Sequence, residues 1–474
     1  MPSYGVGEAI HPSSIAVVGA SDSQGSSGQQ FFSALVEYGF QGDLYPINPG
    51  RNEVMGYKAY PSVDAVPGPV DYVISCIPAG GALKMIQSCV KKGVKCVHLF
   101  TARFSETGRK DAADLEQEIR RTAKDGGVRL IGPNCMGLYY PSRGIAFSDA
   151  LPKESGRAAF VSQSGQVAEE LVRFCALRGV YFSKAISYGN ALDFNECDFL
   201  EYLTDDPETD FILMYMEGAR DGERFFRALR QAARKKPVAV LKGGRGESGR
   251  RMASSHTSSL AGSRKIVTSM IAQAGAVPVD SLEELTDLAA AFAFLDPVQG
   301  FNIGVAGGGG GSSVMAADQC EEAGLEVIPL PDTIREKLKE KGSTIWDWIG
   351  NPADMSIRDS GAFTPGTMLK LMDEDEHFHM LLAIMGDPHH EHQRDMKAEE
   401  SMNQYNLDSI RNTPILAVVP EKSLGGPDFD HWSWRIICEM RTELLNRGIP
   451  FYPTLGRAAR AARKFAEYHI RAHK

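Results

Sequence analysis

The sequence predicts an α/β fold in which parallel sheets are covered by helices. Short apolar runs alternate with amphipathic runs along all 474 residues, a pattern typical of βαβ units. Several of these apolar runs break directly into loops of small residues, as strands do where an open α/β sheet binds a ligand. A chain of this length predicts two to four domains.

The first block of the chain contains five strand-like runs. The run 14–20 breaks into a small polar loop and is followed by a helix-like stretch over 29–38. The remaining four runs are 43–49, 70–78, 94–100 and 128–133. Together they predict a nucleotide-binding type of sheet over about the first third of the chain.

Two further blocks repeat the order strand, small-residue loop, helix. The second has strand-like runs at 158–161, 211–216 and 237–241, and the third at 302–306, 380–385 and 414–419. The junctions near residues 150 and 298 are polar or contain Pro and Gly, as linkers tend to. We therefore expect three domains, over 1–150, 151–297 and 298–474.

Composition excludes several classes of function. The net charge of -9 gives no overall basic field for nucleic acid or an anionic membrane surface. No apolar run approaches the roughly 20 residues that span a bilayer, and the first residues do not resemble a signal peptide. The eight cysteines form no CxxC pair, so we expect reduced thiols in a cytoplasmic enzyme.

The loop Gly19–Gly28 is the first candidate site. Its small residues would let backbone amides approach a phosphate at the start of a helix. The loop lacks the GxGxxG pattern of a nicotinamide site and the closing Gly-Lys-Ser/Thr of a Walker A sequence. Alone, a tight turn needed only for packing explains it equally well.

A second candidate is the run Ser162, Gln163, Ser164 and Gly165, where a strand enters a helix. The free N–H groups of a first helical turn carry about half a positive charge and would hold a phosphoryl group. Serine is also a common N-cap, and that simpler interpretation is preferable for the motif in isolation.

The third candidate is His256, which lies in a stretch rich in Ser, Thr and Gly. A neutral imidazole can attack phosphorus when an acidic residue holds its tautomer. Glu217, at the end of the run 211–216, is placed where open sheets carry functional groups. From composition alone, His256 is more simply a loop histidine with one hydrogen bond.

A fourth candidate is the cluster His389–His392. It could bind a metal, but adjacent residues rarely all face one ion and no acidic supporting shell is evident. A solvated loop is the preferred interpretation, and we predict no metal site.

Considered together, the motifs follow an order that resembles a known family. The order is Val18–Ser21, Tyr45–Pro49, Gly132–Cys135, Ser162–Gly165, Glu217–Gly218 and Ser255–Thr257, with Asp205–Thr209 and Asn351–Asp354 in addition. It resembles the nucleoside-diphosphate-forming acyl-CoA synthetases, the superfamily of succinyl-CoA synthetase, and most of all the alpha subunit of the ADP-forming enzymes. The resemblance implies a Rossmann-like CoA-binding domain followed by two flavodoxin-like ligase domains.

The resemblance also implies residue roles. His256 would carry the phosphate, Glu217 would orient it, and Ser162 to Gly165 would cradle it. CoA would approach the residues Gly19, Ala20, Ser21, Gly28, Ile77, Pro78, Thr101, Ala102, Arg103 and Asn134. Three features depart from the family: Arg103 stands where glycine is frequent, Gly307–Gly311 lacks a proline, and the segment 377–403 looks peculiar to this chain.

The implied reaction interconverts acyl-CoA, phosphate and ADP with acid, CoA and ATP. The chain has no room for an ATP-grasp module, so ATP or ADP and Mg²⁺ are expected on a separate beta subunit in a heterotetramer. Three alternatives remain open: a regulatory or acyltransferase-associated protein that binds acyl-CoA, a CoA-binding redox switch, and a nicotinamide dehydrogenase. The presence of both Glu217 and His256 argues against the first, and the two downstream blocks argue against the second. The missing GxGxxG pattern argues against the third.

Overall fold

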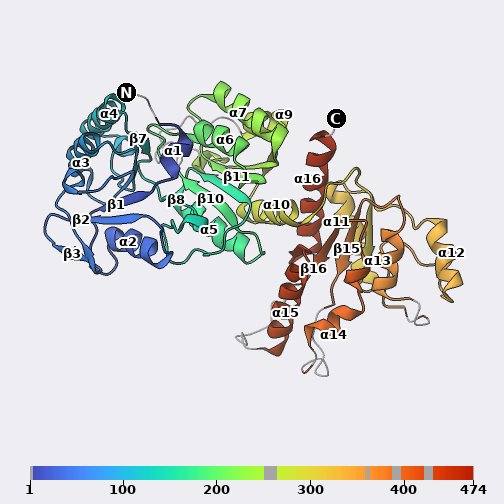
Figure 1. Ribbon diagram of the computed structural model, residues 1–474. Helices are drawn as coiled ribbons and strands as arrows, with labels where there is room; N and C mark the ends of the chain where they lie inside the picture. Colours follow the sequence, from blue (N-terminus) through green and yellow to red (C-terminus); the bar gives the residue numbers. More distant parts are fainter. Residues whose placement is uncertain are drawn as a thin grey trace. The chain divides into compact units, whose positions relative to one another are not determined.

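The computed structural model describes residues 4–249, 264–357, 359, 363–386, 395, 397–420 and 431–472. The chain forms two compact units, Met1–Leu285 and Thr286–Lys474, and each is described by itself (Figure 1). Both units contain parallel sheets with helices packed against them, which confirms the predicted α/β class.

The first sheet has the strand order β2-β1-β5-β6-β7, with all neighbours parallel. Its strands are β1 (Ser14–Val18), β2 (Asp43–Ile47), β5 (Tyr72–Ser75), β6 (Cys96–Leu99) and β7 (Arg129–Ile131), so all five predicted strands are confirmed. The helices α2 (Ser27–Glu37), α3 (Ala79–Lys92) and α4 (Lys110–Asp125) connect them. Because β1 lies between β2 and β5, strand order reverses beside it, which places a ligand crevice at its carboxyl end.

The second sheet has the order β13-β12-β11-β9-β10-β8. The predicted strands are β9 (Ala158–Ser162), β11 (Phe211–Met216) and β12 (Val238–Lys242), and the unpredicted ones are β8 (Gly137–Tyr139), β10 (Phe182–Ser187) and β13 (Val277–Val279). Strand β8 pairs antiparallel with β10, so the chain enters this sheet before residue 150. The helices are α5 (Gly165–Ala176), α6 (Glu196–Asp205), α7 (Gly222–Lys235) and α9 (Arg264–Gln273).

Caps fix where these helices begin. Ser26 accepts a hydrogen bond from the Gln29 amide at α2, and Ser164 accepts one from the Val167 amide at α5. Asn195 and Asp198 form a capping box at α6. Each cap satisfies an amide that has no partner within its helix. Two of these caps, Ser26 and Ser164, lie in loops that the sequence marked as candidate sites.

The second unit contains a parallel sheet of order β14-β15-β16-β17. Its strands are β14 (Ile303–Ala306), β15 (Met380–Ile384), β16 (Ile415–Val418) and β17 (Phe451–Tyr452), of which only β17 was not predicted. The helices are α11 (Gly310–Ala323), α12 (Asp332–Glu340), α13 (Pro365–Asp373), α14 (Ala398–Asn403), α15 (Trp432–Asn446) and α16 (Leu455–Ala472), and α10 (Leu282–Phe294) spans the division between the units. Arg457 pairs with buried Asp287 at 2.7 Å, which ties α16 to the end of α10 that belongs to this unit.

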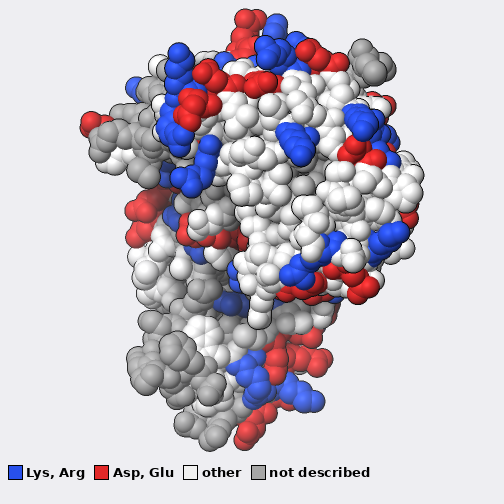
Figure 2. Space-filling view, turned by 90° about the vertical axis from the view of Figure 1, so that its left-hand side faces the viewer, with Lys and Arg blue, Asp and Glu red and all other residues white. Residues whose placement is uncertain are grey.

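The surface carries charge of both signs. On the face of the first unit that includes β2 and α3, Lys and Arg lie beside Asp and Glu, with uncharged residues between them (Figure 2). Among the described residues, no helix has both the length and the apolar content needed to cross a membrane.

Candidate active site

The loop after β1 is shaped by two glycines. Gly19 has a φ of 89°, which favours glycine. A Cβ on Gly28 would lie only 1.9 Å from the carbonyl oxygen of Gly19, so the first turn of α2 packs directly on the end of β1. The same role is played by a glycine in dinucleotide-binding folds, where close helix–strand packing brings the helix start to a phosphate.

Replacing Gly28 with alanine is expected to disturb this loop. The added methyl group must displace backbone rather than a flexible side chain, which typically costs about 1–3 kcal/mol. We expect the thermal unfolding temperature to fall by several degrees and CoA to protect the variant less than the wild type. Gly80→Ala is the control, because nothing lies within 4 Å of a Cβ built there. Equal CoA protection of wild type and Gly28→Ala would contradict a ligand role for the loop.

The other residues of this loop are held in place. Ala20 is buried and its carbonyl accepts a hydrogen bond from Asn48 Nδ2 at 2.8 Å. The Ser21 hydroxyl accepts one from the Ser23 amide at 3.0 Å. A cavity of about 740 Å³ opens beside Gly19 and Ile77, and Lys84 and Lys91 contribute to its wall. Asp64 also lines it and pairs with Lys91 at 2.9 Å. The size of the cavity fits a large ligand such as CoA.

The remaining residues implied for CoA lie at the neighbouring strand ends. Pro78 caps α3, which starts where β5 ends. The Thr101 hydroxyl donates to the Ile77 carbonyl at 2.5 Å, and the Asn134 amide donates to the Thr101 carbonyl at 3.0 Å. Thr101, Ala102 and Arg103 follow β6, and Asn134 follows β7. The structure thus brings all of these residues to the carboxyl ends of the first sheet's strands.

The start of α5 forms the second part of the site. Ser162 ends β9, and its hydroxyl donates to the Ser164 carbonyl at 2.7 Å and accepts from the Ser164 amide at 3.2 Å. A Cβ on Gly165 would lie 2.6 Å from Cγ of Met136, so this helix start packs against the segment that leaves the first sheet. The turn is therefore preformed, with its amides at the positive end of the 12-residue helix α5.

Gln163 joins this turn to Glu217. Its Oε1 accepts hydrogen bonds from the amides of Glu217 at 2.6 Å and Gly218 at 3.2 Å. Strands β9 and β11 are parallel neighbours, with Ser162 paired to Tyr215, so their carboxyl ends meet at one edge. The Glu217 side chain is buried, and the Tyr215 hydroxyl donates to its Oε1 at 3.3 Å. Burial is the main reason why the pKa of Tyr215 is raised, and the nearby Glu217 carboxylate raises it further. The phenol therefore stays protonated.

Lys242 ends the next strand of the sheet and braces this edge. Its ammonium is buried and donates to the carbonyl oxygens of Glu217 at 2.7 Å and Gly243 at 2.5 Å. The chain continues from there toward His256, which lies outside the described residues, between 249 and 264. Asp280 pairs with Arg245 at 2.5 Å and with Arg264 at 2.8 Å, so one carboxylate holds both flanks of that segment.

A junction centred on Asn190 links the two sheets, and only its Asn134 and Arg103 were anticipated from the sequence. Asn190 Nδ2 donates to Glu106 at 2.9 Å, and its Oδ1 lies 3.5 Å from Asn134 Nδ2. The Arg103 amide donates to Glu106 at 2.5 Å, and Arg220 donates to the Asn190 carbonyl at 2.8 Å. Arg103 has a φ of 78°, which explains physically why glycine suits its position.

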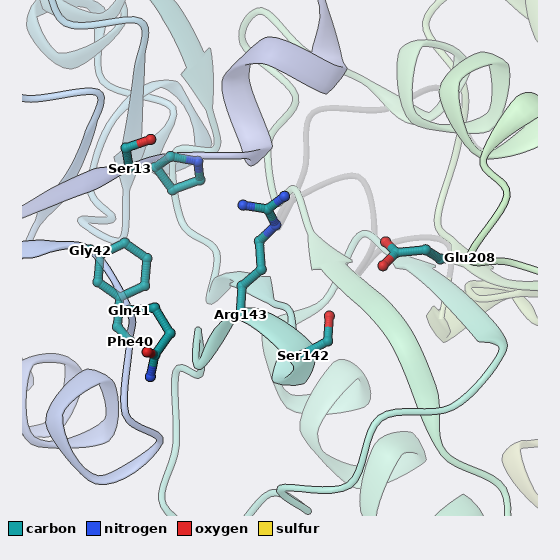
Figure 3. Close-up of a pocket in the computed structure, with 8 residues that line it drawn as sticks. Ser13, Phe40, Gln41, Gly42, Ser142, Arg143 and Glu208 are labelled. Atoms are coloured by element: carbon teal, nitrogen blue, oxygen red, sulfur yellow. The ribbon is translucent and has the colours of Figure 1, made fainter.

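A separate cleft lies at the opposite, amino edges of the same sheets (Figure 3). It measures about 500 Å³, and its lining includes Ser13, Gly42 and Glu208, which precede β1, β2 and β11. Arg143 stands between the Phe40–Gly42 segment and Glu208 (Figure 3). Glu208 also pairs with Lys184 at 2.5 Å. The Lys184 side chain lies in the middle of β10 and has 0% exposure. This cleft therefore lies apart from the candidate site at the carboxyl edges.

The third block of the chain repeats the strand–glycine–helix arrangement. Gly307 and Gly308 follow β14 with φ of 106° and 78°, and Gly309 is the N-cap residue of α11. Asp354 lies beside the first turn of α11: a Cβ built on Gly310 would be 2.9 Å from Oδ2 of Asp354. His389–His392 lies outside the described residues, and the described residues contain no group of three or more His, Cys, Asp and Glu suited to a metal ion.

Comparison with known proteins identifies the two halves of the first unit. A CoA binding domain model matches residues 13–141, and a model of the succinyl-CoA ligase like flavodoxin domain matches residues 155–292. In the solved structure of dinucleotide-forming acetyl-coenzyme A synthetase 1 from Candidatus Korarchaeum cryptofilum, with phosphate and ADP, one chain matches with a TM-score of 0.80. That chain is 29% identical, and the match covers 97% of this chain and 96% of the other.

Relatives of known activity cover most of the chain. The alpha subunit of ADP-forming acetate–CoA ligase I from Pyrococcus furiosus is 34% identical over 462 residues, 95% of each protein. ADP-forming acetate–CoA ligase I from Archaeoglobus fulgidus is 38% identical over 379 residues, and the match covers 79% of this chain and 54% of that one. The chain thus spans nearly all of the first relative and about half of the second. The chain therefore belongs to the ADP-forming acyl-CoA synthetases and is of their alpha-subunit type.

Proposed function

We propose that this chain is the alpha subunit of an acid–thiol ligase that interconverts carboxylic acid, CoA and ATP with acyl-CoA, ADP and phosphate. The observation that supports this best is the pairing of the α5 start with Glu217 through Gln163 at one sheet edge. An anion-binding helix start beside a buried carboxylate suits a phosphorylated imidazole, whose phosphate is anionic and whose ring is cationic.

The roles of the residues follow from this chemistry. His256 takes a phosphoryl group from ATP, and Glu217 holds the tautomer of its imidazole. Ser162, Gln163, Ser164 and Gly165 offset the phosphate charge with fixed dipoles. An oxygen of the acid then attacks phosphorus, the N–P bond breaks and its electron pair returns to the ring. The CoA thiolate attacks the resulting acyl phosphate at its carbonyl carbon, and inorganic phosphate leaves.

The partner and the domain division belong to the same proposal. ATP or ADP and Mg²⁺ bind to an ATP-grasp beta subunit, and two copies of each chain form a heterotetramer in the cytoplasm. Within this chain we assign CoA binding to residues 1–150, of which β8 already pairs with the second sheet, and the two ligase domains to 151–297 and 298–474. The closely packed Gly19–Gly28 loop and the cavity beside it support the placement of CoA.

Labelling with ATP tests the covalent step. The complex of this chain with its copurifying ATP-grasp protein is incubated with Mg²⁺ and γ-labelled ATP, and acid-labile phosphate on this chain is measured. We expect the label on wild type and none on His256→Ala. His377→Ala serves as the control, because that side chain is 61% exposed and pairs only with Asp375 among the described residues. Full labelling of His256→Ala would refute the mechanism.

A further inference from the structure

We propose that Arg220 binds the carboxylate of the acid substrate, in a subsite centred on Asn190 between the CoA loop and the phosphate cradle. This inference rests on the proposed ligase function and names a specificity residue for it. The acyl group passes between the CoA sulfur and a phosphate oxygen, so its subsite must lie between the groups that hold those two atoms.

Asn190 occupies such a position. Its side chain contacts Glu106 and Asn134, which belong to the strand ends of the first sheet, and its carbonyl accepts from Arg220. Arg220 follows Glu217 by three residues and lies two residues after Gly218, the second of the amides that Gln163 binds. One asparagine therefore connects the edge proposed for CoA with the edge proposed for the phosphate.

The backbone around Asn190 is unusually strained. Among the described residues, the non-glycine residues with positive φ are Met55, Arg103, Asn134, Ala191 and Asn406. Three of these five belong to the junction: Arg103 bonds to Glu106, Asn134 lies beside Asn190, and Ala191 follows it. Such conformations cost about 1–3 kcal/mol each and persist mainly where a functional geometry requires them. The concentration at one place indicates a binding function for the junction.

Arg220 is the cation suited to an anionic ligand at this place. Lys242, at the end of the neighbouring strand β12, directs its ammonium to two backbone carbonyls. The Arg220 guanidinium donates to one carbonyl, and its charge acts on the buried Glu196 carboxylate without forming an ion pair in the described part of the chain. A guanidinium has five N–H donors in a planar fork that matches a carboxylate. Arg220 is also exposed, so a substrate can reach it.

The acid is a better match for Arg220 than inorganic phosphate is. The phosphate already has the start of α5, a turn whose shape is fixed by the Ser162 and Ser164 hydroxyls and which lies at the positive end of that helix. Arg220 is held instead by the Asn190 carbonyl, and the Asn190 side chain contacts residues that follow strands of the first sheet. A monocarboxylate bound there would present one oxygen toward the cradle, as formation of an acyl phosphate requires.

Steady-state kinetics of the complex test this assignment. With the acid that gives the highest kcat/KM among acetate, isobutyrate, 4-hydroxybutyrate and phenylacetate, we expect Arg220→Gln to raise the KM for acid about 10- to 100-fold, the value of one lost charge-assisted hydrogen bond. Arg220→Lys should recover part of the loss. The KM for CoA and the phosphate label on His256 should stay at wild-type level, since neither needs the acid.

The control and the opposing outcomes are distinct. Arg227→Gln removes an exposed arginine of α7, 68% accessible, that pairs with Glu223, and should change none of these constants. An unchanged KM for acid in Arg220→Gln, or a raised KM for phosphate alone in the reverse direction, overturns the inference while the ligase function stands. A wild-type complex that neither labels His256 nor activates any acid overturns the proposed function instead. If Arg220→Gln unfolds, the same comparison is made with Arg220→Lys, which keeps the donor to Asn190.

Discussion

Replacing Glu217 with glutamine is expected to slow phosphorylation of this chain by roughly 10²- to 10⁴-fold, the range typical for loss of a group that assists proton placement in a transition state. Glutamine keeps the size of the side chain and its contact with the Tyr215 hydroxyl. It removes the negative charge that would stabilise a cationic phosphohistidine and can present N–H in place of an acceptor. The expected loss is therefore in the rate of the chemical step.

The rate of label incorporation from γ-labelled ATP, measured by rapid quench, checks this prediction. The backbone amide of Glu217 donates to the side-chain oxygen of Gln163, a bond that the substitution leaves in place. Glu217→Gln should therefore unfold at the wild-type temperature and keep CoA protection. Glu223→Gln is the matched control, because that carboxylate lies at the start of α7 and is 80% exposed. A labelling rate within a factor of three of wild type would exclude Glu217 as the positioning residue.

The sequence was most informative where burial is uniform. Strands β9 and β12 are buried along their whole length, and their apolar runs predicted their positions to within one residue. The carboxyl ends of such strands also carry Ser162 and Glu217, so the rule that ligands bind at that edge found both. No single motif shows that Ser162 and Glu217 lie close together. The parallel pairing of β9 with β11 shows it, because Ser162 is paired with Tyr215.

The residues that were missed depend on contacts distant in sequence. Strand β10 (Phe182–Ser187) has a lysine in its centre, and a charge there argues against a buried strand unless its partners are known. The role proposed for Asn190 and Arg220 depends on their bonds to Glu106 and to each other, and the positive φ angle of the neighbouring Ala191 is not revealed by residue type. Arg220 could have been found from its place three residues after Glu217.

The buried lysine of β10 also explains the motif Asp205–Thr209, which the proposed chemistry does not use. Lys184 has 0% side-chain exposure and binds Asp206 at 2.8 Å and Glu208 at 2.5 Å. Thr209 donates to Asp206 at 2.7 Å, and the Tyr140 hydroxyl donates to Glu208. Burial raises the pKa of Asp206 and of Glu208, but the hydrogen bonds and charge of Lys184 outweigh it, so both pKa values are lowered.

Lys184→Met is therefore expected to destabilise the first unit by about 3–5 kcal/mol, because it leaves Asp206, 4% exposed, as a buried charge without its cation. For a domain of this size, that corresponds to a fall in unfolding temperature of roughly 10 °C. Lys91→Met is the control. It removes an ammonium that is 75% exposed from its pair with Asp64, and an exposed pair contributes about 1 kcal/mol or less.

The destabilisation caused by Lys184→Met is expected to depend on pH. Because the pKa values of Asp206 and Glu208 are lowered on folding, the wild-type cluster stabilises the fold above the ordinary carboxyl pKa and loses that stability as the pH falls through the lowered values. In Lys184→Met the hydrogen bonds of Thr209 and the Glu208 amide to Asp206 remain, but the lysine charge that opposed its burial is lost. Acid therefore neutralises the group that destabilises the variant. The difference in unfolding temperature between wild type and variant should therefore be larger at pH 8 than at pH 5.

Adding Asp206→Asn and Glu208→Gln to Lys184→Met should recover part of the loss at pH 8, since no uncompensated charge remains. A difference that is the same at both pH values would mean that lost packing around the lysine stem, rather than the buried carboxylate, accounts for the destabilisation.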